Sequence, residues 1–479
     1  MNRAIKRVSI VAGLLIFALL INATLSYFLR SDSLNNNPQN RRVQQAQFTA
    51  PRGAILVGNT PIAQTTPAAG DFPYLRTYAN GPMYAPVTGY FSFIYGRNKL
   101  EQAYNAELTG TANSQVFQQL MNSLTGRASD VGSLQTTIDA KAQQAAWDGL
   151  QGKQGAVVAL DYTTGAILAY ASTPSYDPAV LSSGDLAATQ TAWTTLNADP
   201  AAPMADRAGR EIYPPGSTFK LITAAAALEA GMTPDSKVDS PDQLTLPGTS
   251  TQLGNAGGES CGGEQITLQQ ALQVSCNTAF ANVGLQLGQN AIAAQAAKFG
   301  FGSAFGGDVN SAVSSFPANL DQAETAMSAI GQYNVMASPL QMAVVAAAIA
   351  NGGQVMKPYF VSQVIGADLN TVSKYTPTSL GQAIGASTAG ELQQMMQAVV
   401  SSGTGKLAQI PGLTIGGKTG TAQSASGAAP YAWFVGYATQ LHVAVCVFVA
   451  NAATNDDMAQ TGGSTAAPIF KQVIQALNS

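Results

Sequence analysis

The segment PPGSTFKLITAAAALEAG, Pro214–Gly231, is the most informative part of this chain of 479 residues for predicting its fold. A Pro-Pro-Gly run interrupts whatever precedes it, and the alanine-rich run that follows ends at a glycine, the usual residue just past a helix end. The pattern predicts a helix whose first turn contains Ser217. Because residues three apart share a helix face, we expect Ser217 and Lys220 to lie within hydrogen-bond reach of each other.

This serine and lysine have a chemical meaning because the chain contains a single histidine. A serine hydroxyl is a poor nucleophile until a base removes its proton, and only a neutral Lys220 can be that base. Burial, the positive end of the helix dipole and a second nearby cation all favour the neutral amine. The N–H of Ser217 is an expected oxyanion donor. The plainer interpretation is a capping serine followed by a solvated lysine.

A second motif, Ser275-Cys276-Asn277, interrupts an apolar run that is typical of helix on either side. In a loop, Ser275 and Asn277 project to one side while Cys276 points back into the protein. Such a loop would offer a hydroxyl as proton relay and an amide that binds a peptide substrate. The plainer interpretation is two polar residues that end one helix and cap the next.

A third motif, Lys418-Thr419-Gly420-Thr421, has the setting of a strand. Gly420 and the glycines before it are expected to let a ligand's backbone approach closely. A substrate that adds as an extra strand would place its terminal carboxylate at Lys418, Thr419 and Thr421, and the N–H of Thr421 is the expected second oxyanion donor. The plainer interpretation is a lysine that protects a sheet edge. The three motifs in this order favour serine and lysine acyl-transfer chemistry.

Beyond these motifs, the chain resembles the penicillin-binding proteins over nearly its whole length. LQTTIDAKAQQAA from Leu134, GAVVALDYTTGAILAYASTPSYDP from Gly155, GGKTGTAQ and YAWFVGYA are similar to transpeptidase-domain segments. PRGAIL around Arg52 and GRNKLEQAYNAELTG from Gly96 resemble the non-catalytic domain of class B enzymes. SCNTAF is similar to the actinobacterial penicillin-binding protein A type. Many relatives have a histidine where this chain has Tyr431.

The resemblance implies a serine penicillin-recognising transpeptidase fold, α/β of the α+β type, with a central antiparallel sheet flanked by helices and a small N-terminal pedestal domain. It implies a D,D-transpeptidase that forms an acyl-enzyme from D-Ala-D-Ala, cross-links stem peptides of peptidoglycan, is inhibited covalently by β-lactams and needs no cofactor. It implies that Ser217 is the nucleophile, Lys220 its base and Ser275 the proton relay, and that Lys418 is the cation that binds the carboxylate. The implied substrate contacts are Asn277, Thr419, Gly420 and Thr421.

Other activities are compatible with the same motifs. A D,D-carboxypeptidase or a β-lactamase-like hydrolase shares the acylation step and differs only in passing the acyl group to water. A non-catalytic sensor of β-lactams or cell-wall fragments is a further alternative. A glycosyltransferase and division or elongation proteins are the implied protein partners, and the pedestal is a candidate surface for them.

The charge and hydropathy of the chain place it at a membrane rather than on a nucleic acid. The formal net charge is -3 and only 10% of residues are charged, so no basic surface is expected for a nucleic-acid partner. The apolar run Val8–Leu29 is long enough to span a bilayer, and Arg3, Lys6 and Arg7 precede it. This predicts a single-pass anchor with the catalytic part outside the cytoplasm. The alternative is a cleaved signal peptide.

The chain has three cysteines, Cys261, Cys276 and Cys446. A disulfide between Cys261 and Cys276 is predicted for an oxidising compartment and would brace the Ser275 loop; two buried thiols are the alternative. With His442 as the only histidine, no metal site of ordinary ligand number is expected. Cys446 and His442 are both assigned to one apolar strand. Cys446 is predicted to be a core residue, and His442 a structural or surface residue.

Four regions are predicted along the chain: a cytoplasmic tip and transmembrane anchor at 1–30, a polar linker at 31–47, a non-catalytic pedestal domain at 48–127 and the transpeptidase domain at 128–479. Within the last, strands flank the turn at Thr163-Thr164-Gly165, helices follow, and three strands and a final helix close the domain. Strands at both ends of the domain predict one sheet built from distant parts of the chain.

Overall fold

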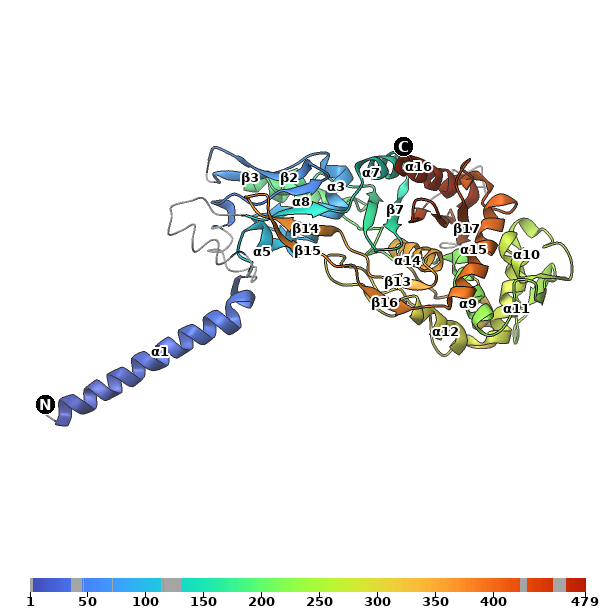
Figure 1. Ribbon diagram of the computed structural model, residues 1–479, viewed down its shortest axis with the longest axis horizontal. Helices are drawn as coiled ribbons and strands as arrows, with labels where there is room; N and C mark the ends of the chain where they lie inside the picture. Colours follow the sequence, from blue (N-terminus) through green and yellow to red (C-terminus); the bar gives the residue numbers. More distant parts are fainter. Residues whose placement is uncertain are drawn as a thin grey trace.

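A computed structural model describes residues 3–35, 45, 47–70, 72–112, 115, 131–422, 429–450 and 462–479. Figure 1 shows α1 (Arg3–Asn35) leading away from a body that has β2, β3 and α3 at one end and α10 to α12 at the opposite end. The first helix is followed by a sheet-rich part, a central sheet covered by helices, and a lobe made mostly of helices.

The central sheet has five strands in the order β17-β18-β19-β7-β8, and every neighbouring pair is antiparallel. Its strands are β7 (Gln154–Asp161), β8 (Ile167–Thr173), β17 (Ile415–Ala422), β18 (Tyr431–Ala438) and β19 (Val443–Ala450). Because β7 pairs with β19 across almost 300 residues of sequence, the prediction of one sheet made from both ends of the domain is confirmed.

Both faces of this sheet are buried under helices, so its strands alternate between two hydrophobic cores. In β18, Trp433 and Val435 face the core beneath α14 (Pro339–Ala350), while Ala432 and Phe434 face the core beneath α7 (Ala140–Gly149) and α16 (Ala467–Leu477). Every side chain of α14 from Pro339 to Ile349 is buried. Helices buried on all sides are apolar all round, as this one is.

The helical lobe lies between β8 and β17 in sequence and carries two of the three motifs. Its helices are α9 (Lys220–Glu229), α10 (Leu268–Gln273), α11 (Asn277–Leu287), α12 (Gln289–Lys298), α13 (Gln322–Ala329) and α15 (Ala386–Ser401). Two short two-stranded sheets join it, β9 (Lys237–Asp239) with β12 (Gln265–Thr267), and β10 (Gln243–Thr245) with β11 (Gln252–Gly254). A third pairs β13 (Gln354–Met356) with β16 (Ser379–Gln382).

The second sheet combines strands from both predicted domains. Its order is β15-β14-β6-β1-β2-β3, with strands β1 (Ile55–Val57), β2 (Thr60–Pro67), β3 (Tyr74–Tyr78), β6 (Ser133–Thr136), β14 (Val361–Ile365) and β15 (Thr371–Lys374). Parallel pairing of β1 with β6 sets Ile55 opposite Leu134. Three strands of this sheet, which we call the N-terminal sheet, follow the predicted boundary between 127 and 128 in sequence, so the sheet joins residues from both sides of that boundary.

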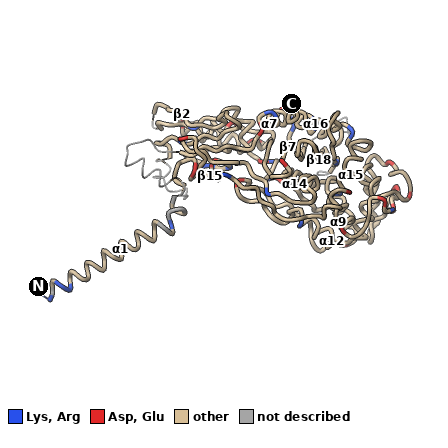
Figure 2. The backbone as a smooth tube through the Cα atoms, in the orientation of Figure 1, with Lys and Arg blue, Asp and Glu red and all other residues tan. Residues whose placement is uncertain are grey.

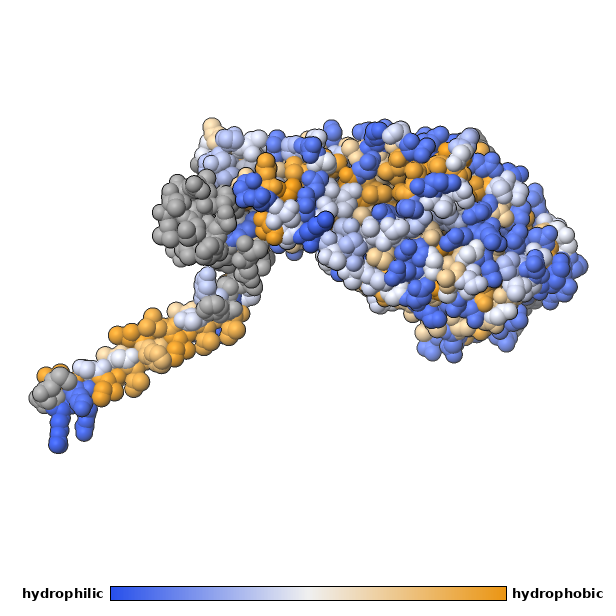
Figure 3. All heavy atoms as spheres, in the orientation of Figure 1, coloured by the Kyte–Doolittle hydropathy of each residue, from blue (hydrophilic) through white to orange (hydrophobic). Residues whose placement is uncertain are grey.

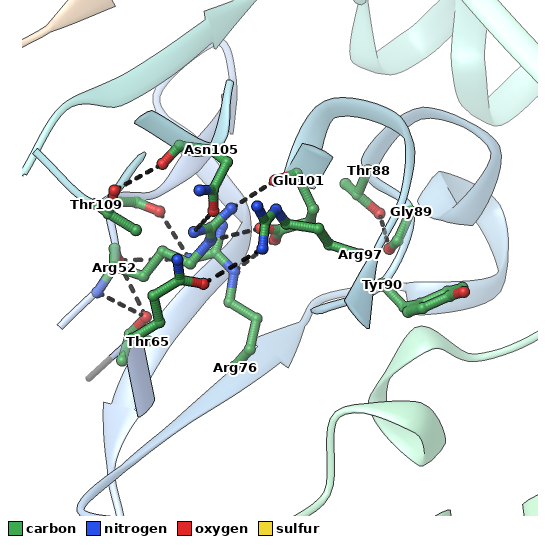
Figure 4. A network of polar contacts seen from close by, with 12 residues as sticks. Arg52, Thr65, Arg76, Thr88, Gly89, Tyr90, Arg97, Glu101, Asn105 and Thr109 are labelled. Atoms are coloured by element: carbon green, nitrogen blue, oxygen red, sulfur yellow. Dashed lines mark hydrogen bonds and ion pairs between the residues drawn. The ribbon is translucent and has the colours of Figure 1, made fainter. Parts of the chain in front are cut away.

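Buried charges hold the N-terminal part together. α4 (Lys99–Ala103) carries Glu101, whose carboxylate receives Arg52 Nε at 2.6 Å and Arg76 Nε at 2.7 Å, all three side chains being almost completely excluded from solvent (Figure 4). Burial alone would raise the pKa of Glu101, but the two guanidinium groups hold it below its usual value. Short neighbours complete this part, namely α3 (Gly81–Thr88), α5 (Asn105–Leu108), and the hairpin of β4 (Phe91–Ser92) and β5 (Gly96–Arg97).

Two polar contacts fasten the N-terminal part to the catalytic part. Lys99 forms an ion pair with Asp206, which also accepts the hydroxyl hydrogen bond of Tyr170 on β8. Tyr104 donates to Asp308 at 3.3 Å. Helix α8 (Leu186–Ala198) adds a stacked contact between Trp193 and Tyr95, with ring centroids 4.1 Å apart. The pedestal and catalytic parts are thus packed against each other.

Helix α1 contains a segment, Ile5–Tyr27, with mean hydropathy 2.4 and no part of its most apolar window buried against the rest of the chain. This helix is long and apolar enough to cross a membrane. Its apolar length and the basic residues at its N-terminal tip are visible in Figures 2 and 3. The helix continues to Asn35, into the predicted linker at 31–47, and most of the remaining length of that linker, 36–44, lies outside the described residues.

Candidate active site

The Pro-Pro-Gly run places Ser217 in a short 3-10 turn, Gly216–Phe219, and the α-helix itself begins at Lys220. Gly216 has φ +53° and donates its N–H to Gly331 at 3.0 Å. A Cβ at this glycine would lie 2.8 Å from the carbonyl oxygen of Thr421, so only glycine allows the turn to approach the edge strand so closely. Ser217 is half-buried at this junction.

Lys220 is completely buried, and its amine faces the Ser275 loop. Its Nζ donates to the backbone oxygen of Ser275 at 2.8 Å and to Asn277 Oδ1 at 2.7 Å, and it lies 3.4 Å from Ser275 Oγ. Within the described residues no hydrogen bond joins Lys220 to Ser217, so the direct bond predicted from their spacing is absent. The reason is competition: the loop offers the amine several oxygen acceptors that are fixed in place.

Ser275 lies between two lysines. Lys418 Nζ donates to Ser275 Oγ at 2.7 Å and to the carbonyl oxygen of Thr419 at 3.0 Å. The hydroxyl is therefore in contact with both amines, which is the geometry required to pass a proton between them. Ser275 adopts φ +62°, a conformation that non-glycine residues rarely occupy and that tends to occur at functional sites. The three motifs meet in one hydrogen-bonded cluster.

Strand β17 lies at the edge of the central sheet, with Lys418 buried and Thr421 exposed. Thr419 is nearly buried, and its hydroxyl lies 2.7 Å from that of Thr404 in the loop after α15. Gly420 allows a close approach within the protein itself, and its role in leaving room for a ligand's backbone stays a prediction. A Cβ there would lie 2.8 Å from Thr218 Cγ2, so the space is filled by the protein's own nucleophile turn.

Cys261 and Cys276 form a disulfide with their Cα atoms 5.8 Å apart, and Cys446 is a buried free thiol in β19. Cys276 is buried behind the loop, as expected for the middle residue of the motif. His442 does not lie in the strand: it occupies an exposed turn just before β19 with φ +55°. The assignment of His442 to the strand is therefore wrong, because β19 begins one residue later, at Val443.

Burial shifts the pKa of both active-site lysines downward. The pKa of Lys220 falls well below its usual value because burial penalises the ammonium, and because the positive charge of Lys418 lies close by. Burial lowers the pKa of Lys418 to about 7. The oxygen acceptors around Lys220 oppose the shift without reversing it. The two groups share Ser275, so their protons are lost in coupled steps.

These shifts predict the pH dependence of acylation. In its predicted role as the cation that holds a carboxylate, Lys418 must be an ammonium, so the second-order rate constant for acylation by penicillin should fall as pH rises through about 7. On the acid side the rate should fall as Lys220 gains a proton. Replacing Lys418 by arginine, whose charge persists at all accessible pH, should remove the alkaline fall. A wild-type profile that stays flat across neutral and mildly alkaline pH contradicts this account.

Sequence reasoning did not find Asn255, Thr404, or the buried trio of Arg52, Arg76 and Glu101. Asn255 lies 20 positions before Ser275, after β11, yet its side-chain oxygen accepts the N–H of Asn277 at 2.9 Å. Nothing in a single sequence marks such a contact, because it depends on how the β10–β11 hairpin folds back onto α11. Thr404 had a signal, since the segment SSGTGK from Ser401, which contains it, is also similar to a transpeptidase-domain segment of the penicillin-binding proteins.

A serine on a turn, two buried lysines bridged by a hydroxyl, and an end strand of the described sheet beside them are features of active-site serine enzymes that use lysine in place of histidine. Comparison with known proteins agrees with this class. Residues 155–475 match the penicillin binding protein transpeptidase domain, and residues 52–134 match the penicillin binding protein A dimerisation domain.

Full-length relatives are known. The chain is 40% identical over 486 residues to "Peptidoglycan D,D-transpeptidase PbpA" of Mycolicibacterium smegmatis, and 39% identical over 495 residues to the protein of that name in Mycobacterium tuberculosis. Each alignment covers 99% of both chains. The structure of penicillin-binding protein A from M. tuberculosis as a ceftriaxone acyl-enzyme superposes with TM-score 0.87 and 38% identity, covering 91% of this chain and 100% of that one.

The penicillin G acyl-enzyme of the same protein superposes with TM-score 0.85 and 39% identity, covering 90% of this chain and 100% of that one. The chain therefore belongs to the penicillin-binding protein transpeptidase family, and its N-terminal domain places it in class B. The resemblance inferred from the motifs and the expected fold are both confirmed.

Proposed function

We propose that this protein is a membrane-anchored peptidoglycan D,D-transpeptidase whose acylated residue is Ser217. The observation that carries the proposal is the cluster in which Ser275 Oγ lies 3.4 Å from Lys220 Nζ and 2.7 Å from Lys418 Nζ. It brings a base, a relay and a carboxylate-binding cation to the turn that holds the serine. The names of the full-length relatives support the same reaction.

In the proposed reaction Ser217 Oγ attacks the carbonyl carbon between the two D-alanines, and neutral Lys220 takes its proton. The N–H groups of Ser217 and Thr421 hold the oxyanion. As the C–N bond breaks, the proton passes through Ser275 to the departing amine of D-alanine. An acceptor amine then attacks the ester, loses a proton along the same route, and releases Ser217 with its hydroxyl restored.

The substrate contacts come from the loop and the edge strand. Lys418, Thr419 and Thr421 receive the terminal carboxylate, and the stem peptide lies along the free edge of β17 as an added strand. Gly420 offers only its backbone to the stem peptide, and the position requires glycine because a side chain there would collide with Thr218. Asn277 contacts the peptide's amide or side chain. β-Lactams present a carboxylate and a strained amide in the same arrangement, so they acylate Ser217 and remain attached.

For the anchor we propose that α1 spans the membrane with Arg3, Lys6 and Arg7 on the cytoplasmic side, which sends the body outside the cytoplasm. The pedestal sheet would then lie near the membrane and offer a surface to a glycosyltransferase and to division or elongation proteins. The ion pair of Lys99 with Asp206 and the Tyr104 contact support a pedestal that moves with the catalytic part.

Product analysis tests the activity. Purified protein supplied with a stem peptide ending in D-Ala-D-Ala and with an amine acceptor should release D-alanine and form a cross-linked dimer in comparable amounts. D-Alanine release without any dimer would favour a carboxypeptidase, and rapid turnover of a chromogenic cephalosporin would favour a β-lactamase. The alternative of a non-catalytic sensor requires that neither product appears.

A further inference from the structure

Helix α11 has no cap of its own. It begins at Asn277, and the side chain of the preceding residue, Cys276, which is bonded to Cys261, accepts no hydrogen bond from the first backbone N–H groups of the helix. The first N–H groups of a helix have no acceptor within the helix. Serine, threonine, aspartate or asparagine normally supplies one from the capping position. At α11 the acceptor must come from elsewhere in the chain.

Asn255, which follows β11, supplies this acceptor. Its Oδ1 receives the N–H of Asn277 at 2.9 Å, the N–H of Thr278 at 3.1 Å and the hydroxyl of Thr278 at 3.4 Å. We propose that Asn255 is a positioning residue for the reaction, acting as the cap of α11 from a distant segment and thereby fixing the loop that carries Ser275 and Asn277. The inference rests on the proposed function, since it assigns Asn255 a role relative to that site.

The same segment fixes which way the Asn277 carboxamide points. Asn277 Nδ2 donates to the carbonyl oxygen of Gly254 at 3.1 Å, which leaves Oδ1 facing Lys220 Nζ at 2.7 Å. An amide has a donor end and an acceptor end, so a flipped carboxamide would turn N–H groups toward the lysine amine. Gly254 and Asn255 together hold the acceptor end toward the proposed base.

The disulfide and Asn255 act at different points. The disulfide links Cys276 to Cys261 and so limits how far the loop can separate from the 254–261 segment. It does not satisfy the N–H groups of α11 or orient Asn277. Within the described part of the chain, the Nδ2 atom of Asn255 is buried and has no partner. The oxygen therefore performs the function, and an aspartate, which offers the same acceptor, should replace the asparagine.

The test compares acylation of the full-length variants by a fluorescent penicillin. Asn255→Ala should slow acylation about tenfold, because a loop that is no longer fixed holds Ser275 and Asn277 in the reactive geometry for less of the time. Its acid limb should move to lower pH, because Asn277 Oδ1 is no longer held toward Lys220 and the ammonium loses an acceptor that favours it. Within the described residues, Lys418 is the charged group whose proximity lowers the pKa of Lys220. Asn255→Asp should remain within about threefold of wild type. Gln252→Ala, an exposed change on β11, is the matched control and should be unaffected.

If Asn255→Ala only lost stability, the fraction of protein that is labelled would fall, but the acid limb of the acylation rate would stay at the same pH. Asn255→Ser keeps a hydroxyl on a shorter side chain and preserves the comparison if the alanine variant does not fold. Its acylation rate should be lower than that of the wild type and of Asn255→Asp, and higher than that of Asn255→Ala. Equal rates and equal pH limbs in all folded variants would overturn the role of Asn255. Failure of the wild type itself to be labelled would instead overturn the proposed function.

Discussion

Replacing Ser217 by alanine is expected to abolish both D-alanine release and covalent labelling by penicillin. Removal of the nucleophile from a serine enzyme lowers the rate by a factor on the order of 10⁶, which would place the remaining activity below detection. The fold should be unaffected, because the Ser217 side chain makes no hydrogen bond within the described residues and is only half-buried. The readouts are product formation, labelling and the melting temperature of the same preparation.

The matched control is Ser373→Ala, which removes an exposed hydroxyl from β15 in the N-terminal sheet. This variant should keep full activity and labelling. Substantial labelling of the Ser217→Ala protein would mean that another hydroxyl is acylated, and Ser275 would be the first to examine, because it lies between both lysines.

Replacing Lys220 by methionine should reduce the rate of acylation by roughly 10³, within the range attributed to a general base. Methionine approximates the length of the lysine side chain without the amine, so Ser217 would remain in place but would have no group to take its proton. The remaining slow reaction should lose the acid limb of its pH profile. The measurement is the pseudo-first-order rate of labelling across neutral pH, alongside a thermal melt.

Lys374→Met is the control for this change, since Lys374 is an exposed lysine on β15. Its labelling rate should equal that of wild type. If Lys220→Met retained a rate within tenfold of wild type, Lys220 would not be the base, and Lys418 acting through Ser275 would become the stronger candidate.

Much of the catalytic fold was predictable because the sequence patterns are local. The strands around the Thr163-Thr164-Gly165 turn and those after Lys418 are long apolar runs, and their lengths and flanking turns identify them without any tertiary information. Membership of one sheet followed from their placement at both ends of the domain. The apolar length of α1 was equally clear from composition.

The pedestal was less predictable because its sheet is assembled from distant segments. Short strands such as β6, β14 and β15 have no strong periodicity, and their pairing depends on contacts between residues more than 200 positions apart, such as Thr136 with Val361. The buried carboxylate of Glu101 was missed for a related reason. In sequence a Lys-Leu-Glu-Gln run is typical of an exposed helix. The ion pairs with Arg52 and Arg76 compensate the cost of burying the Glu101 carboxylate, and they depend on the tertiary fold.

Within the site, the residue types and their order were predictable but the contacts were not. The spacing of Ser217 and Lys220 permits a direct hydrogen bond, yet the amine is held by Ser275 and Asn277. The acceptor that binds the Lys220 amine depends on how rigidly the Ser275 loop is held, and Asn255 and the disulfide hold that loop. The lesson is that the motif specifies the chemistry, while residues outside it determine the resting geometry.

The central claim is that Ser217 carries the acyl group, and intact-mass analysis with peptide mapping tests it most directly. Full-length protein incubated with penicillin G should gain the whole mass of one antibiotic molecule, since ring opening releases no leaving group. After proteolysis the added mass should be found on the peptide that contains Ser217. An adduct mapped to the peptide of Ser275, or an unchanged mass in protein shown to be folded, would contradict the account.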